Sequence, residues 1–223
     1  MIPTMNEEES IGSVLDEIHK SMKGSGLEYE ILVVDTESKD RTRVISTEKG
    51  AIVVEEPHRG YGRAYKTGFE RAGGDIIATL DADCTYPAEE IPRLCRMILE
   101  ENLDFITTDR FGKMDERAMS AKHRFGNWVL TTATNILFRV RLKDSQSGMW
   151  VFRKDCLQRL NVNNDGMPFS EEMKIEAFKK VHSREVPIHY RQRVGDVKLS
   201  SWKDGRKNLA FLLKKRFSIG RAR

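Results

Sequence analysis

Short apolar runs alternate with amphipathic segments through the first 110 residues of this chain, and this order limits the possible folds more than any other feature. Apolar runs of strand length lie at residues 29–34, 51–55, 75–81 and 103–107. Segments with helical spacing separate them: one begins at Asn6, a good N-cap, and others lie at 43–49, 62–72 and 87–98. Strands that alternate with helices of this size form a parallel sheet between two helical layers. The sequence therefore predicts an α/β fold, a doubly wound, mostly parallel sheet with helices on both faces.

The apolar run that ends at Asp81-Ala82-Asp83 carries the clearest chemical signal. Residues i and i+2 of a strand point the same way, so we expect both carboxylates at the carboxyl end of the strand, where such sheets bind ligands. Two hard oxygen ligands suit Mg²⁺ or Mn²⁺, which fill their other positions with substrate phosphates and water. The alternative is a solvated turn, in which aspartate is common. Asp35 ends the run at 29–34 in the same way, although it could instead cap the next helix.

Composition indicates a soluble globular protein of one domain, or of one domain with a small appendage. The 223 residues are 39% apolar and 32% charged, and the longest apolar stretch, residues 128–140, is interrupted by polar side chains. We therefore expect no membrane span and no signal peptide. The three cysteines lack paired spacing, which indicates reduced thiols in the cytosol. The apolar start, Met1-Ile2, is short for a central strand, so we expect that the natural chain begins a few residues earlier.

Charge is distributed unevenly along the chain. The net charge of +4 combines +7 on residues 203–223 with −3 on residues 1–202. Apolar residues from Leu209 to Ile219 lie among the basic ones, a pattern typical of a segment that binds an anionic membrane surface. The alternative is a closing helix packed on the domain. We divide the chain into a main domain, 1–202, and a basic amphipathic tail, 203–223, and predict that deleting residues 217–223 weakens binding to anionic liposomes.

After Asp109 the alternation gives way to a basic, helical stretch from Arg110 to Arg141. Strand candidates follow at 149–152 and 184–188, with a helix at 171–180 between them. Such a basic stretch is usually a solvated helical face. Its position after the paired aspartates leaves a functional role as the alternative. The main domain is accordingly divided into residues 1–109 and 110–202.

Two sets of motifs cover essentially the whole chain. The first set is Pro3-Thr-Met-Asn-Glu7-Glu, Val33-Val-Asp35-Thr-Glu-Ser38-Lys-Asp40-Arg-Thr42, Arg59-Gly-Tyr-Gly62, Ala72-Gly-Gly74-Asp75 and Asp81-Ala-Asp83. In this order it resembles the nucleotide-sugar half of a family 2 glycosyltransferase with the GT-A fold. The second set is Asp109-Arg-Phe, Arg124-Phe-Gly-Asn127, Asp144-Ser-Gln-Ser147-Gly148, residues 166–173 with Glu172, and Arg193-Val-Gly-Asp-Val-Lys198-Leu. It resembles dolichyl-phosphate or polyprenyl-phosphate sugar synthases, particularly the archaeal type.

The resemblance implies a nucleoside-diphosphate sugar as donor and assigns its binding residues. The nucleoside pocket is implied for Pro3, Met5, Glu7, Val34, Asp35 and Thr36. The metal, Mg²⁺ or Mn²⁺, is implied for Asp81 and Asp83, with Ala82 between them in the substrate site. The phosphates of donor and acceptor are implied to meet Arg110, Arg124, Arg193 and Lys198.

Two residues depart from the family pattern. Thr36 stands where many relatives carry a second acidic residue or Asn, which leaves both uracil and guanine open as the base. Thr85 stands where the mannosyl-phosphate branch has Gln as a third metal ligand, so that position is left to water or to Asp83 alone.

The implied reaction is an inverting displacement, with Asp83, Arg110, Arg124 and Glu172 as the catalytic candidates. A polyprenyl monophosphate acceptor is mostly dianionic at neutral pH and needs little help from a base. A hydroxyl acceptor on a glycan or protein would need a carboxylate base, for which Glu172 and Asp144 are the candidates. We expect a cytoplasmic enzyme, peripheral at the inner face of the cell membrane. A nucleic-acid-binding protein is a remote alternative, against which the acidic main domain argues.

Overall fold

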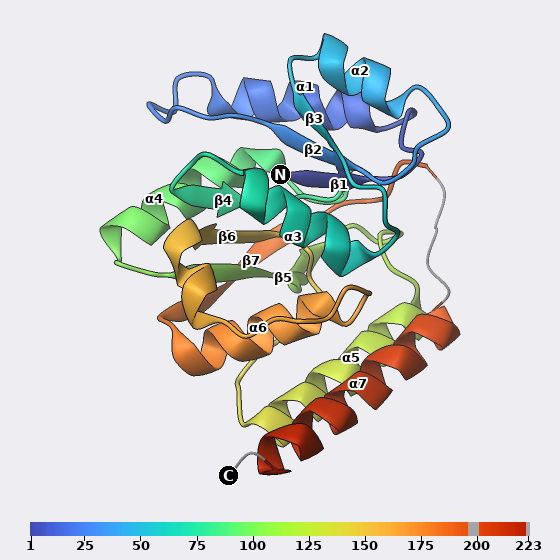
Figure 1. Cartoon of the computed structure of the whole chain (residues 1–223), viewed down its shortest axis with the longest axis vertical. Helices are drawn as coiled ribbons and strands as arrows, with labels where there is room; N and C mark the ends of the chain where they lie inside the picture. Colours follow the sequence, from blue (N-terminus) through green and yellow to red (C-terminus); the bar gives the residue numbers. More distant parts are fainter. Residues whose placement is uncertain (196–200, 222–223) are drawn as a thin grey trace.

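The structure, a computed structural model, describes residues 1–195 and 201–221, and in the last helix the side chains of residues 205–217. The chain alternates between strands and helices, as the sequence predicts (Figure 1). The strands are β1 (Ile2–Thr4), β2 (Leu32–Asp35), β3 (Ile52–Glu55), β4 (Ile76–Ala78), β5 (Phe105–Met114), β6 (Trp150–Arg153) and β7 (Ser183–Tyr190). The helices are α1 (Ile11–Met22), α2 (Thr42–Glu48), α3 (Tyr61–Arg71), α4 (Ile91–Glu100), α5 (Ala121–Phe138), α6 (Phe169–Lys180) and α7 (Ser201–Arg221), with 3-10 turns η1 (Ala88–Glu90) and η2 (Lys154–Arg159).

The strands form two sheets. In the first, β1, β2 and β3 are parallel, so the ends of β1 and β2 meet at the Thr4 and Asp35 pair. In the second, the order is β4-β6-β5-β7; β5 and β7 are parallel, whereas β6 runs antiparallel to both of its neighbours. The predicted α/β class with a mostly parallel sheet is confirmed. The antiparallel β6 is a feature that its local sequence did not indicate, because strand direction depends on the connection rather than on the strand's own residues.

Helices cover both faces of the sheets, and each face has its own apolar core. On one face the core contains Leu15 of α1 and Leu94 of α4, neither of which is accessible to solvent. On the other face Tyr65 of α3 packs on Trp150 and Phe169, with ring centroids 5.1 and 5.6 Å apart. Side chains of this size each stabilise the fold by roughly 1.5–3 kcal/mol when buried. The two cores therefore fix the strands whose ends carry the candidate site.

The first helix begins later than the sequence indicated. It starts at Ile11, after Ser10, whereas Asn6 was expected to be the N-cap. The Asn6 side chain is used elsewhere, since its Oδ1 accepts a hydrogen bond from Lys39 N at 2.7 Å, and Asn6 N donates to Ser38 Oγ at 2.8 Å. The residues that look like a helix start thus join the end of β1 to the loop after β2. This contact assembles two motifs that are 30 residues apart in sequence.

The C-terminal helix α7 lies lengthwise beside α5, below the sheets in Figure 1. Leu212 of α7 is fully buried in a cluster with Leu130 and Phe138 of α5 and Ile175 of α6. The helix begins at Ser201, two residues before the expected boundary of the tail. In this arrangement α7 is part of the packed domain, while its outer face remains exposed. No helix within the described parts of the chain is long and apolar enough to cross a membrane.

Candidate active site

Asp81 and Asp83 lie in a turn beyond β4. The sequence predicts that strand alternation orients the two carboxylates, but the strand ends at Ala78. The turn after the strand therefore orients them instead. Asp83 is 2% exposed, and its Oδ1 accepts hydrogen bonds from Thr85 N at 3.0 Å and Thr85 Oγ1 at 2.6 Å. Thr85 therefore supports the carboxylate of Asp83. Ala82 packs into the core and is 4% exposed, so its side chain faces away from the candidate site.

The two carboxylates repel each other in a poorly solvated place. Burial and then the nearby Asp83 charge raise the pKa of Asp81 to about 7, with Glu7 adding to the effect. A cation beside these two carboxylates would reduce their repulsion. Arg193 supplies part of that charge, because its Nη2 lies 2.6 Å from Asp83 Oδ2.

The site fits a divalent cation, by the chemistry of its donors. Asp83 Oδ2 is buried and receives no well-directed hydrogen bond from any described residue. Its ion-pair contact is Arg193 Nη2 at 2.6 Å, so a cation at this oxygen would share it with the guanidinium or displace that group. Within residues 1–195 and 201–221, we find no cluster of three or more His, Cys, Asp or Glu side chains that could hold a metal ion without further ligands. A cation on Asp81 and Asp83 would need oxygen ligands from phosphate or water, which is the usual coordination of Mg²⁺.

Gly148 makes room beside Asp81, a role that its motif alone did not indicate. A Cβ atom on Gly148 would lie 3.3 Å from both carboxylate oxygens of Asp81 and 3.1 Å from the Tyr61 hydroxyl. The glycine is held from the backbone, since its N–H donates to the hydroxyl of Tyr86 at 2.6 Å and its carbonyl accepts from Thr79 Oγ1 at 2.9 Å. Tyr61 was not among the expected site residues. Only the folded chain brings it to Asp81.

Arg110 and Asp144 form a buried ion pair. Arg110 Nε donates to Asp144 Oδ2 at 2.6 Å and Nη2 donates to Oδ1 at 2.9 Å, with the two side chains 9% and 0% exposed. Burial alone would raise the pKa of Asp144, but the Arg110 guanidinium holds it below its usual value. The guanidinium also lies 5.3 Å from the centroid of the Tyr190 ring. Asp144 is thus ionised and fully engaged, which is unsuited to a general base.

Glu172 is also engaged, at a place removed from the aspartate pair. It is 4% exposed, and its Oε2 accepts hydrogen bonds from Asn163 N at 2.9 Å and Asn164 N at 2.8 Å. Its Oε1 lies 2.9 Å from Lys215 Nζ of α7. Among the described residues, its hydrogen-bond partners belong to the 161–165 segment and to α7. The arrangement supports a structural role for Glu172 rather than the expected catalytic one.

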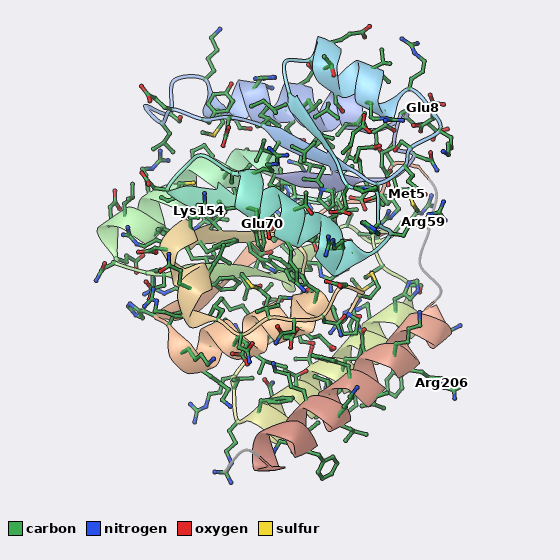
Figure 2. The ribbon with its side chains drawn as sticks, in the orientation of Figure 1. Met5, Glu8, Arg59, Glu70, Lys154 and Arg206 are labelled. Atoms are coloured by element: carbon green, nitrogen blue, oxygen red, sulfur yellow. The ribbon has the colours of Figure 1, made fainter. Side chains whose placement is uncertain are left out.

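The residues expected at the nucleoside gather at the ends of β1 and β2. Asp35 is 1% exposed and accepts hydrogen bonds from Thr4 Oγ1 at 3.0 Å and Ser38 Oγ at 2.5 Å. Pro3 pairs in register with Val34, and Thr36 N donates to Thr4 O at 2.9 Å. Figure 2 shows Met5 and Arg59 on the same side of the molecule. The segment that carries Asp81 lies beside this edge, since Leu80 N donates to Met1 O at 3.2 Å.

The remaining expected residues are less closely gathered. Arg124 is exposed in the first turn of α5, whose N-cap Ser120 accepts a hydrogen bond from His123 N. Arg193 reaches Asp83, as described above. Lys198 lies outside the described residues.

Some known proteins are similar to this chain in sequence, and others are similar in fold. A low-salt glycan biosynthesis hexosyltransferase of Haloferax volcanii is 37% identical over 216 residues, which are 96% of this chain and 52% of the relative. A dolichyl-phosphate hexose transferase of the same organism is 33% identical over 204 residues, covering 91% of this chain and 86% of the relative. The chain thus spans about half the length of one curated relative and most of the other.

Among solved structures, a glucosyl-3-phosphoglycerate synthase from Mycobacterium tuberculosis, in complex with Mn²⁺, uridine-diphosphate-glucose and phosphoglyceric acid, superposes with a TM-score of 0.77 at 21% identity. The match covers 96% of this chain and 78% of the synthase, and it confirms the GT-A fold. Structures of that synthase with uridine diphosphate hold Mn²⁺ or Mg²⁺. The model of the family described as glycosyl transferase family 2 matches residues 1–160. With the parallel β1–β3 edge and the aspartate pair where this family's motifs predict them, the chain belongs to glycosyltransferase family 2.

Proposed function

We propose that this chain transfers a sugar from a nucleoside diphosphate, UDP or GDP, to a polyprenyl phosphate such as dolichyl phosphate, with inversion at the anomeric carbon and with Mg²⁺ or Mn²⁺. The observation that carries the proposal is the aspartate pair near the nucleoside edge, with the buried Oδ2 of Asp83 facing the positive charge of Arg193 and receiving no well-directed hydrogen bond from any described residue. Such a pair suits a cation that also binds a diphosphate. The names of the relatives, a hexosyltransferase and a dolichyl-phosphate hexose transferase, support the sugar transfer and the lipid acceptor.

Different residues of the chain have different roles in the proposed reaction. Asp81 and Asp83 would hold the cation, which when bound neutralises charge on the leaving diphosphate. Arg193, within ion-pair distance of Asp83, adds a fixed positive charge at the same place. Arg124, exposed at the start of α5, is available to an acceptor phosphate that approaches from solvent. Thr85 and Gly148 keep the two carboxylates oriented and accessible.

The state of the other carboxylates favours a phosphate acceptor over a hydroxyl. A hydroxyl acceptor requires a base, and the two candidates were Asp144 and Glu172. Asp144 is bound to Arg110, and Glu172 is bound to backbone amides and to Lys215. A phosphate monoester is already ionised, so positioning and charge compensation are sufficient. A site for a phosphate acceptor can therefore function although Asp144 and Glu172 are both engaged in other interactions.

The exposed faces of α5 and α7 suit a peripheral contact with a membrane. Phe125, Trp128 and Ile136 of α5 are 66%, 61% and 71% exposed, and Phe217 of α7 is 71% exposed. The rings of Phe125 and Trp128 stack with centroids 5.9 Å apart. Figure 2 shows Arg206 projecting outward from α7. Apolar rings together with basic side chains bind an anionic lipid interface, and that is where a polyprenyl acceptor resides. We place this contact at the cytoplasmic face.

Transfer to the lipid phosphate is the experiment that tests the proposal. Purified protein is incubated with Mn²⁺ or Mg²⁺ and a panel of UDP and GDP sugars, with and without a short polyprenyl phosphate. We expect product only with the lipid phosphate, and none from Asp83→Ala. Asp16→Ala, an exposed aspartate on α1, is the matched control and should retain activity. Donor consumption with a hydroxyl acceptor and none with the lipid would refute the acceptor; no turnover of any donor would refute the transferase.

A further inference from the structure

The helix α7 contacts the domain through buried charges. Lys215 Nζ lies 2.9 Å from Glu172 Oε1 and 3.0 Å from Glu176 Oε1, and the three side chains are only 11%, 5% and 8% exposed. Glu176 has a second cation, because its Oε2 lies 2.6 Å from Lys180 Nζ, whereas the ion pair of Glu172 is with Lys215. Because an unpaired buried carboxylate is strongly unfavourable, Glu172 needs the ammonium group of α7. The contact is therefore more specific than apolar packing between helices alone would require.

The same two glutamates hold the segment 161–165 against α6. Glu172 Oε2 accepts from the amides of Asn163 and Asn164, and Glu176 Oε2 accepts from Asn161 N at 3.2 Å. Each carboxylate thus bonds Lys215 with one oxygen and the segment with the other. Loss of Lys215 would leave Glu172 without that counter-ion, and its carboxylate would be stabilised by turning toward water, away from the amides of Asn163 and Asn164.

The segment 161–165 in turn lies against the start of α3. Arg63 N donates to Asp165 O at 3.1 Å, and Lys66 Nζ donates to Asn163 O at 2.7 Å. The approach is so close that a Cβ atom on Gly62 would lie 2.5 Å from Asn164 O. Backbone therefore packs on backbone here, and a shift of the segment must displace the first turn of α3.

The first turn of α3 carries Tyr61, whose hydroxyl is next to Gly148. The Tyr61 hydroxyl and both carboxylate oxygens of Asp81 lie 3.1 and 3.3 Å from the position that a Cβ atom on Gly148 would take, so Tyr61 and Asp81 are neighbours across this glycine. A second contact joins α7 to the segment that ends at Gly148. Asn208 of α7, 5% exposed, donates to Gln146 Oε1 at 3.1 Å, and Gln146 belongs to the 144–148 segment.

We propose that Lys215 and Asn208 of α7 are positioning residues for the donor site. Lys215 acts through Glu172, Glu176 and the segment 161–165 on the start of α3, and Asn208 acts through Gln146 on the segment that ends at Gly148. The helix that the sequence suggested as a membrane tail thereby supports the two segments that carry Tyr61 and Gly148, the neighbours of Asp81. The proposal rests on the proposed function, since it concerns the donor of that reaction, and it makes donor affinity depend on the docking of α7.

Nucleotide binding and hydrogen exchange test the proposal without a lipid acceptor. Affinity for UDP and GDP with Mn²⁺ is measured by calorimetry, and amide exchange is followed by mass spectrometry in residues 60–66, 144–148 and 161–165. Lys215→Met should weaken binding of whichever nucleotide the wild type binds at least five-fold and speed exchange at 60–66 and 161–165. Lys179→Met, an exposed lysine on α6, should change neither by more than two-fold. Lys215→Arg, which keeps the charge, should restore most of the affinity.

Further variants separate positioning from a general loss of stability. Glu172→Gln combined with Lys215→Met removes the stranded charge, and its nucleotide affinity should be no worse than that of Lys215→Met alone. Asn208→Ala should speed exchange at 144–148 and leave 161–165 unchanged. If folded Lys215→Met and Asn208→Ala bind nucleotide like the wild type, or if their exchange is unaltered, the proposal is wrong. A wild type that binds no nucleotide would refute the proposed function instead, and the exchange measurements would still decide the positioning role.

Discussion

Replacing Asp144 by asparagine tests whether this carboxylate holds Arg110 or acts as a base. Asp144 accepts hydrogen bonds from Arg110 Nε, Nη2 and backbone N, and from Gln146 N. Asparagine has nearly the same shape but no charge and only one acceptor oxygen. The Arg110 side chain, 9% exposed, would remain buried without its counter-ion.

The size of the effect follows from the burial of the pair. Removing one partner of a buried ion pair destabilises a protein by about 3–5 kcal/mol. In a domain of this size, 1 kcal/mol shifts the melting temperature by roughly 2–4 °C. We therefore expect Asp144→Asn to lower Tm by about 6–20 °C. Because total stabilities are about 5–15 kcal/mol, the variant should still fold at low temperature.

Thermal and urea unfolding measure the stability, and transfer to polyprenyl phosphate is assayed well below the Tm of the variant. A double variant, Arg110→Met with Asp144→Leu, is the control for stability, since an apolar pair of similar volume should recover most of the loss. Loss of a general base would instead lower turnover by about 10²–10⁴-fold with little change in stability. If Asp144→Asn melts within about 2 °C of the wild type and loses activity on that scale, the structural interpretation is refuted.

Three further perturbations have defined outcomes. Burial raises the pKa of Glu171 to about 8, so protonated Glu171 stabilises the folded state fully below its ordinary pKa of 4.5, and this stabilisation is lost as the pH rises to 8. Glu171→Gln should therefore make the free energy of unfolding in urea fall less steeply over this pH range. An unchanged pH profile would contradict this prediction. Gly148→Ala places a methyl group 3.3 Å from both oxygens of Asp81, and we expect at least five-fold weaker Mn²⁺ binding with nucleotide present; equal affinity by calorimetry would show that the space is not needed. Deletion of residues 217–223 removes the exposed Phe217 and should reduce co-sedimentation with anionic liposomes while leaving neutral liposomes unaffected; equal sedimentation with both chains would argue against the membrane contact.

The sequence was sufficient for the order of the elements in the first half of the chain. Apolar periodicity depends on residues close together in the chain, and so the strands and helices up to residue 107 lie within a few residues of their predicted places. In parallel strands, the residues that follow each carboxyl end meet at one edge. Asp35 and Asp81 could therefore both be expected after the carboxyl ends of strands from the order of strands and helices alone, although the folded chain places β2 and β4 in different sheets.

Local patterns misled where a polar side chain had a partner far along the chain. Asn6 has the features of an N-cap, but its side chain bonds the loop after β2. Glu172 has the spacing of a family motif, but its carboxylate is bound by amides and by Lys215. Both residues are polar groups that must be satisfied on folding, and the sequence does not state which of several distant donors will satisfy them.

The sequence by itself determined the α/β class, the paired aspartates and the basic, apolar-striped C-terminus, because each depends on residue type and near-neighbour spacing. The tertiary structure decided which charges are available for chemistry. It paired Arg110 with Asp144, placed Arg193 beside Asp83, and brought Tyr61 and Gly148 to Asp81. It also packed α7 against α5 and α6. Such pairings join residues tens of positions apart, and their energies depend on burial and distance, which exist only once the chain has folded.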